Sequence, residues 1–346
     1  MKPILGVMRR ILLLACLVLS FAAASTPGAT GAVSRSWAAP QIQAVVDAGL
    51  MAPSTADFRP DESLTAGELA IVLAAIGVPE VVASDPFRSV TMRELDAQLV
   101  TAVGLRSSAR DLRLAAVYAG LAPRPWLGTE TVARMLGFRV NHLKSQEELE
   151  IQLSQPATRA EAAYSVARLL ALQEDEIESV RLALEAFTFP ELTTWQQTVL
   201  RRALRFVGTP YVWAGVSERP QQLFGRVLPG GFDCSGFVWR VFKLEPFAGG
   251  ETLASVLEGR TTYDMSGEVA KAARIARDAL QPGDVVFFGS QGSRSKPTEV
   301  GHMGIYVGNG WMAHSSDRGT TLTPLTGWYE TRFAWGRSPL SEAGLS

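Results

Sequence analysis

The sequence predicts an α+β protein in two parts, a helical repeat region followed by a domain with an antiparallel sheet. At 346 residues the chain is too long for one ordinary domain and suits two, each with a sizeable core. In the C-terminal part, helical patterns come first and most of the strand-like segments follow after residue 284. This order of elements is typical of an α+β domain.

The first 24 residues have the layout of a secretory signal peptide. Basic residues precede an apolar run over 11–23, and small residues then suit cleavage before Ser25. We therefore expect an exported protein. An uncleaved membrane anchor, or lipoprotein processing at Cys16, are the alternatives. Cleavage would leave Cys234 as the only cysteine, so no internal disulfide is expected.

Three capping boxes recur between residues 34 and 172, each with Thr three residues before Glu and ahead of an apolar helical pattern. The pairs are Thr65 with Glu68, Thr91 with Glu94, and Thr158 with Glu161. Three boxes in register indicate helical units that stack to bury their faces.

The repeats resemble the S-layer homology module, a helical unit with which many exported bacterial proteins hold cell-wall polysaccharide. The first copy matches well, whereas the stretch over 85–136 is degenerate. The resemblance implies S-layer homology-like repeats over 34–172 with cell-wall polysaccharide as their partner. A helical spacer without a ligand is the alternative, since repeats often serve only packing.

Residues 173–193 are predicted to form a linker helix, with an acidic start and one apolar face. The residue before Pro190 avoids helical angles, so the helix ends there, and we place the second domain at 194–340. Within this domain we expect helices over 194–207 and 266–277, a buried strand over 285–288, and strands over 320–322 and 332–335.

A short helix is predicted to begin at Cys234. Asp233 is a good N-cap, and Phe237 and Val241 lie one turn apart on an apolar face. At a helix N-terminus, free backbone N–H groups and the helix dipole favour a thiolate. Cys234 is therefore a candidate nucleophile, and a buried, inert cysteine is the alternative.

Two of the three histidines, His302 and His314, lie in one predicted hairpin. A three-residue loop over 308–310 would pair Val307 with Trp311, and both histidines would then share one face. A two-residue loop would put them on opposite faces. A shared face therefore predicts an odd loop with a left-handed Gly310.

A shared face lets His302 serve as the base for Cys234 while His314 orients His302. One thiolate and two histidines supply only three ligands, without a paired Cys or His motif. Zinc is thus the weaker interpretation, and no metal or other cofactor is expected.

Four motifs, over 210–213, 232–236, 280–284 and 301–306, resemble the signature of the NlpC family. These are bacterial cell-wall cysteine peptidases with a papain-like α+β fold. The resemblance implies cleavage of peptidoglycan stem peptides between γ-D-glutamate and a diamino acid. By motif, Cys234 matches the nucleophile, His302 the base and His314 the third polar residue. Tyr211 matches a tyrosine that holds the oxyanion, and Asp233 and Ser235 match positions that line the substrate groove.

The sequence departs from the family pattern beside the expected groove. Ala214 stands where the family usually has glycine, and the polar loop over 216–231 is longer than usual. An insertion over 290–298 is expected to form a mobile loop near the site. These departures bear on specificity rather than on the chemistry. Trp213 and Tyr306 are expected to be core aromatics.

The sequence therefore predicts a secreted peptidoglycan endopeptidase held at the cell wall or envelope by its N-terminal repeats. A non-catalytic wall-binding or scaffold protein is one alternative. An amidase or acyltransferase with the same triad is another, because acyl-enzyme chemistry does not name its acceptor. A formal net charge of -1 and the lack of any Lys- or Arg-rich run argue against nucleic acid as a partner.

Overall fold

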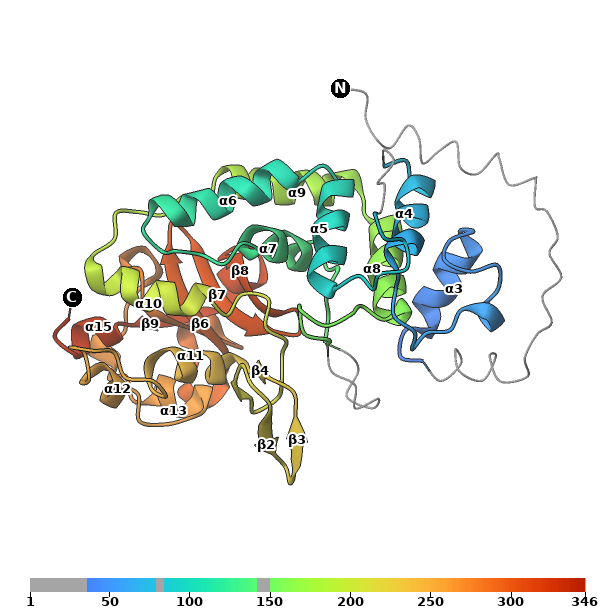
Figure 1. The fold of residues 1–346 in the computed structure, drawn as a ribbon. Helices are drawn as coiled ribbons and strands as arrows, with labels where there is room; N and C mark the ends of the chain where they lie inside the picture. The colour runs from blue at the N-terminus through green and yellow to red at the C-terminus, as the bar shows by residue number, and fades with distance from the viewer. Residues whose placement is uncertain (1–35, 79–83, 142–149, 346) are drawn as a thin grey trace.

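The computed structural model describes residues 36–78, 84–141 and 150–345. The signal peptide expected over 1–24 lies outside the described residues. Within these ranges, no helix combines the length and the apolar character that a membrane crossing needs. A helical region leads into a domain built on one sheet, as Figure 1 shows.

The helical region contains six α-helices among its described residues. They are α3 (Ala39–Asp47), α4 (Ala66–Ala75), α5 (Met92–Ala102), α6 (Arg106–Tyr118), α7 (Leu127–Met135) and α8 (Arg159–Ala171). The boxes that begin α4 and α5 are complete, with both reciprocal hydrogen bonds. The third is half formed. The Thr158 hydroxyl accepts from the Glu161 N–H, but the Glu161 carboxylate lies 3.5 Å from Arg139 Nη1 instead of returning to Thr158.

The residues that precede the three boxes form a closed ring of backbone hydrogen bonds. Leu64 N–H donates to Ala157 O over 2.8 Å, Ala157 N–H donates to Val90 O over 2.8 Å, and Val90 N–H donates to Leu64 O over 2.9 Å. Around the ring, each segment therefore donates to one of the other two and accepts from the remaining one, in one rotational sense. The three capped helices therefore meet at their N-terminal ends around this ring and do not stack in a line.

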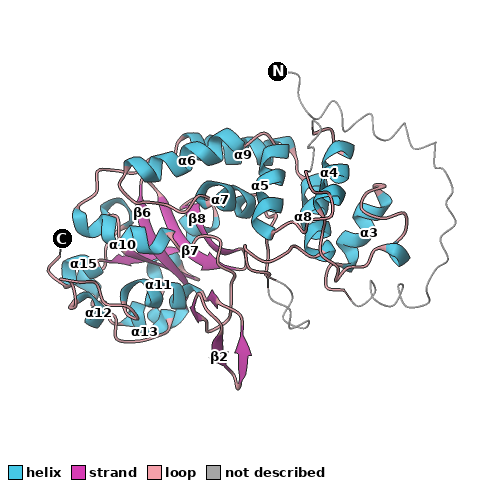
Figure 2. Cartoon of the chain, in the orientation of Figure 1, coloured by secondary structure: helices cyan, strands magenta, loops and turns pink. Residues whose placement is uncertain are grey.

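The linker helix α9 (Glu174–Glu185) is followed by α10 (Thr194–Leu204). An antiparallel sheet of five strands then has the order β8-β7-β6-β5-β9. Its strands are β5 (Val285–Gly289), β6 (Val300–Gly308), β7 (Trp311–Ser316), β8 (Gly319–Pro324) and β9 (Phe333–Arg337). Helix α11 (Cys234–Phe242) packs on β6 and β7, while α7 of the helical region packs on β8 (Figure 2). An α+β domain with an antiparallel sheet is confirmed.

Two expectations for this domain were wrong in detail. The helix predicted over 266–277 is α13 (Thr262–Gly267), because Thr261 and Asp264 form a capping box that starts it early. Residues 216–231 are not an irregular loop. They form β1 (Val216–Ser217) paired with β4 (Gly231–Phe232), and a hairpin of β2 (Gln221–Leu223) and β3 (Arg226–Leu228).

The hairpin of β6 and β7 has the expected face relation, although its loop is different. Gly308, and not Val307, pairs with Trp311, so the loop is Asn309–Gly310, with left-handed φ values of 47° and 77°. The register shifts between Tyr306 and Gly308, which leaves Val307 as an extra residue in β6. This bulge restores the odd count, and Ile305 pairs with Ala313 as the shared histidine face requires.

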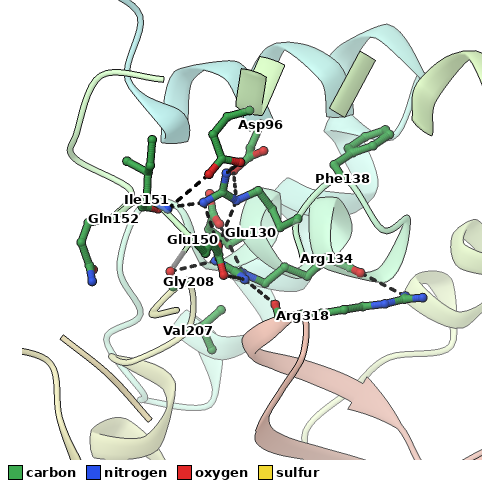
Figure 3. A network of polar contacts seen from close by, with 12 residues as sticks. Asp96, Glu130, Arg134, Phe138, Glu150, Ile151, Gln152, Val207, Gly208 and Arg318 are labelled. Carbon is green, nitrogen blue, oxygen red and sulfur yellow. Dashed lines mark hydrogen bonds and ion pairs between the residues drawn. The ribbon is translucent and has the colours of Figure 1, made fainter. Parts of the chain in front are cut away.

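A polar cluster with the buried side chains of Arg134, Arg139 and Glu150 joins the helical region to the sheet domain (Figure 3). Arg134 on α7 donates to Gly208 O over 2.9 Å and also to Arg318 O in the turn between β7 and β8. Arg318 returns a hydrogen bond of 3.0 Å to Met135 O. Glu150 bridges Arg134 and Arg139 at 2.8 and 2.7 Å. The two parts of the chain are thus held together by directional bonds.

Candidate active site

Cys234 is the first residue of α11, and the sequence positions it there through the Asp233 cap. Asp233 Oδ1 accepts a hydrogen bond from the Gly236 N–H. Phe237 and Val241 are fully buried and fix the helix against the sheet. Cys234 is half-buried and is the only free cysteine among the described residues. The thiol is therefore held at a helix N-terminus, as predicted.

His302 and His314 meet across the hairpin of β6 and β7. The His302 Nε2 and His314 Nδ1 atoms are 2.9 Å apart, and the two rings are edge to face with centroids 5.0 Å apart. The other nitrogen of His314, Nε2, lies 3.0 Å from Thr323 Oγ1 on β8. Only Nδ1 of His302 remains for a further partner. Thr323 was not anticipated, because its register to His314 depends on a third strand.

The two histidines sit in a pocket of aromatic rings that the sequence did not reveal. Tyr329 lies in α14 (Trp328–Arg332), between β8 and β9, with its ring 5.2 Å from His314 and 5.9 Å from His302. Phe288 on β5 is 5.9 Å from His302. These rings keep water away from the imidazoles, and no motif marks the short helix that supplies Tyr329.

Burial sets the protonation of the site. It lowers the pKa of His302 to about 4, and it lowers the pKa of His314 well below its usual value, with help from the charge of His302. Burial, followed by the Asp233 carboxylate, raises the pKa of the Cys234 thiol to about 12. Two backbone N–H groups, of Ser235 and Met303, act in the opposite direction.

The resting site is therefore a neutral thiol beside a neutral imidazole. This differs from the thiolate that the helix N-terminus predicted, because desolvation of the sulfur outweighs the hydrogen bonds from backbone N–H groups that stabilise a thiolate. The Met303 N–H, next to His302 in β6, contributes to the pKa of Cys234 and so places the thiol against this stretch of the strand.

An open cavity of about 970 Å³ brings together most of the predicted site residues. Cys234, His302, Tyr211, Asp233 and Ser235 all line it, while His314 is 1 % exposed and lies behind His302. No lining residue comes from 290–298, which form short 3₁₀ turns, so the expected loop at the entrance is wrong.

Tyr211 is brought to the cavity by backbone pairing with the segment before Cys234. Val212 N–H donates to Phe232 O over 3.2 Å, and Phe232 N–H donates to Pro210 O over 3.1 Å. Burial raises the pKa of the Tyr211 hydroxyl above its usual value, and the Asp233 carboxylate and any thiolate formed at Cys234 act in the same direction. The hydroxyl therefore stays protonated and can donate a hydrogen bond into the cavity.

Arg260 is a residue of the cavity that sequence reasoning missed. Its guanidinium donates to Ser235 Oγ over 2.6 Å and to both Asp233 oxygens over 3.1 and 3.2 Å. It fixes the two side chains that were expected to contact substrate. The residue lies before α13, and its distance along the chain from Asp233 gives no sequence signal.

Trp213 is not the core aromatic that was expected. Its side chain is 63 % exposed at the cavity, whereas its neighbour Val212 takes the buried position. Tyr306 is partly buried, and its hydroxyl accepts from the Gly310 N–H over 2.9 Å. Within the described ranges, no group of three or more His, Cys, Asp or Glu residues is placed to hold a metal ion.

A thiol beside an imidazole that a second imidazole orients, with a tyrosine hydroxyl at the same cavity, is an arrangement suited to nucleophilic acyl transfer. Residues 208–337 match the model of the NlpC/P60 family. The sheet domain is thus an NlpC/P60 domain, and the match includes every predicted site residue.

Curated relatives match between about a third and two fifths of the chain. The bifunctional muramidase/DL-endopeptidase CwlT of Bacillus subtilis is 33% identical over 144 residues, 41% of this chain and 36% of the relative. The γ-D-glutamyl-L-lysine dipeptidyl-peptidase of the same species is 30% identical over 38% of this chain and 35% of the relative. The murein DD-endopeptidase MepH of Escherichia coli is 32% identical over 36% of this chain and 38% of the relative. The chain spans little more than a third of the length of these relatives.

Solved structures show lower similarity. An NlpC/P60 family protein from Bacillus cereus is 20% identical, covers 58% of this chain and 59% of its own, and has a TM-score of 0.32. RipD of Mycobacterium tuberculosis is described as a non-catalytic NlpC/P60 domain protein. It is 20% identical, covers 42% of this chain and 98% of its own, and has a TM-score of 0.31.

Proposed function

We propose that this protein is a secreted peptidoglycan hydrolase, a cysteine endopeptidase that cuts stem peptides between γ-D-glutamate and a diamino acid. The observation that carries the proposal is the hydrogen-bonded chain from Thr323 through His314 to His302, beside the cavity that holds Cys234. The relatives support the substrate class, since their names describe a DL-endopeptidase, a γ-D-glutamyl-L-lysine dipeptidyl-peptidase and a murein DD-endopeptidase.

The hydrogen bonds favour one set of tautomers. A base for Cys234 needs an unprotonated Nδ1 on His302, so Nε2 carries the proton and donates to His314 Nδ1. His314 then carries its own proton on Nε2 and donates to Thr323 Oγ1. Thr323 and His314 together orient His302 and set its tautomer.

The neutral pair implies that the proton moves during attack and not before it. As Cys234 Sγ bonds to the scissile carbonyl carbon, its proton passes to His302 Nδ1. The oxyanion accepts hydrogen bonds from the Cys234 N–H and the Tyr211 hydroxyl, each worth on the order of a hundredfold in rate. His302 then protonates the leaving amine as the C–N bond breaks and leaves a thioester.

Hydrolysis of the thioester closes the cycle. His302 takes a proton from water, the hydroxide bonds to the acyl carbon, and the C–S bond breaks to release a carboxylate. The proton returns to Cys234 Sγ. An amine in place of water would give acyl transfer on the same residues, so the products decide between the two reactions.

Digestion of purified peptidoglycan tests the proposal. The full chain is compared with Cys234→Ala, and the fragments are mapped by mass. We expect new amino termini on the diamino acid with the wild type and none with Cys234→Ala. Fragments that form equally with both proteins would refute the role of Cys234. A wild type without products would favour the non-catalytic wall-binding alternative.

We further propose that the helical region holds wall polysaccharide, as its resemblance to S-layer homology modules implies. The closed ring of three copies supports a unit built for more than spacing. Sedimentation of the Cys234→Ala chain with sacculi, before and after the polysaccharide is stripped, tests this. Loss of sedimentation after stripping is expected, and unchanged sedimentation would favour the spacer alternative.

A further inference from the structure

Three large aromatic side chains stand exposed around the mouth of the catalytic cavity. Trp213 is 63 % exposed, Phe224 is 70 % exposed and Tyr263 is 52 % exposed, and all three line the cavity. They come from separate segments: the turn after Tyr211, the tip of the hairpin of β2 and β3, and helix α13. Exposed apolar groups gathered at one mouth indicate a binding surface.

The hairpin of β2 and β3 holds Phe224 at its tip in an unfavourable backbone conformation. Phe224 has a φ of 53° and Gly225 a φ of 79°, as in a two-residue turn whose first position favours Asn or Gly. A bulky residue at positive φ is uncommon and costs free energy. The chain therefore keeps an aromatic ring, exposed, where a small polar residue would fit the backbone better.

The inner and outer parts of the cavity differ in chemistry. Near Cys234 the walls are polar, with Asp233, Ser235 and Arg260 bonded to one another. The mouth is aromatic. The stem-peptide residues around the proposed scissile bond are small or charged, and they find their partners in the polar inner part. At about 970 Å³ the cavity is at the upper end of the range for ligand pockets, so it has room for more than such a peptide.

We propose that this aromatic mouth is a saccharide subsite, which binds a pyranose ring of the glycan strand while the attached stem peptide reaches Cys234. The C–H groups on one face of a pyranose pack against aromatic rings, and its hydroxyls stay in water at an open mouth. The inference rests on the proposed function, and it deepens it: the preferred substrate is a stem peptide still joined to sugar. Phe224 is a specificity residue in this scheme.

Two substrates with the same peptide test the subsite. One is a stem peptide linked to its disaccharide, and the other is the same peptide without sugar. The full chain is compared with Phe224→Asn, which suits the left-handed backbone and so preserves the hairpin. We expect Phe224→Asn to lower kcat/KM on the sugar-linked substrate about fivefold to tenfold more than on the free peptide. Equal effects on both substrates, or no effect on either, would overturn the subsite.

Val227→Thr is the matched control. Val227 is on the same hairpin and 62 % exposed, but unlike its neighbours Arg226 and Leu228 it does not line the cavity. The ratio of the two kcat/KM values should be that of the wild type. An altered ratio in this variant would show that the hairpin acts through its fold and not through Phe224.

Binding separates failure of the subsite from failure of the proposed function. If the wild type cuts neither substrate, the hydrolase proposal fails. The subsite can still be tested by calorimetric titration. The full chain and Phe224→Asn are each titrated with the tetramer of N-acetylglucosamine. Weaker binding by Phe224→Asn, by about fivefold or more, would support it, whereas equal binding or no binding by either protein would refute it.

Discussion

Two sets of ionisable side chains lie out of water in this protein, and their burial has opposite results. At the junction of the helical region with the sheet domain, Arg134 and Arg139 face the four carboxyl groups of Asp96, Glu130, Glu150 and Glu161. At the active site, His302 and His314 share hydrogen bonds and carry no charge at neutral pH. Burial is therefore accompanied by charged arginine–carboxylate pairs at the junction and by neutral imidazoles at the active site.

The contrast also separates structure from chemistry. A guanidinium remains charged at any physiological pH, so its burial demands carboxylates and gives a permanent link. An imidazole can give up its charge, and the neutral form is the one that accepts a proton. The junction is thus suited to hold two parts of the chain together, and the histidine pair is suited to turnover. Four changes test this division, from the largest expected effect to the smallest.

The largest effect is expected on catalysis at the histidine pair. His302→Gln removes the base but keeps a polar side chain of similar size. We expect kcat on peptidoglycan to fall on the order of a thousandfold or more, because the thiol loses its proton acceptor. Initial rates from mass-mapped digests measure this, with the melting temperature as a control for folding. Activity within tenfold of the wild type would mean that another group is the base.

At the junction the largest effect is expected on stability. Arg134→Met removes one of the two guanidinium partners of the Glu150 carboxylate, leaving Arg139, and it removes the side-chain donor to the Gly208 carbonyl. We expect a loss of about 3–5 kcal/mol in the free energy of unfolding, measured by urea denaturation.

The matched control is Arg181→Met on α9, since Arg181 also bonds two carboxylates but lies at the surface. Its free energy of unfolding should equal that of the wild type, because water screens exposed pairs. If both variants lost the same stability, the junction would be no stronger than a surface ion pair.

The active-site histidines and the junction carboxyl groups should change the free energy of unfolding with pH in opposite directions. The pKa of His302 is lowered to about 4, so its contribution is present above pH 6.5 and is lost as the pH falls toward 4. The pKa of Asp96 is raised to about 6 by burial, so its contribution is present below pH 3.8 and is lost as the pH rises through 6.

Denaturation curves at pH 4, 5, 6 and 7 separate these contributions. His302→Gln should remove a component that rises with pH, and Asp96→Asn should remove one that falls with pH. A change of slope in the same direction for both variants would contradict the division between the two sets.

The smallest effect is expected from Glu130→Gln. Burial and the charge of Asp96 raise the pKa of Glu130 well above its usual value, which favours the protonated form of its carboxyl. An amide of the same shape removes the cost of keeping that proton. We expect a gain of about 1 kcal/mol at pH 7, measured by urea denaturation. A loss of stability would show that Glu130 is an ionised partner of Arg134.

Local signals in the sequence predicted much of the fold. The threonine caps of α4 and α5 and the Asp233 cap of α11 act over one helical turn, so their residues are adjacent in the chain. The shared face of His302 and His314 was also predicted, although by a different loop. The bulge at Val307 could not be foreseen, because either loop satisfies the glycines at 308 and 310.

Contacts between distant segments could not be predicted. Arg260 reaches Asp233 from a separate loop, Thr323 reaches His314 through strand register, and Tyr329 comes from a helix of one turn. The expectation of a thiolate at Cys234 was wrong for the same reason. The sequence shows the helix start that favours a thiolate, but not the packing that desolvates the sulfur.

The ring formed by Leu64, Val90 and Ala157 limits how this region can change. A linear array can gain or lose a unit at its end, because each unit touches only its neighbours. Here the third segment bonds back to the first, so there is no end at which to add or remove one. Duplication or deletion of a single copy would open the circle and leave a donor and an acceptor unmatched. Three is thus the number of capped segments that closes this ring.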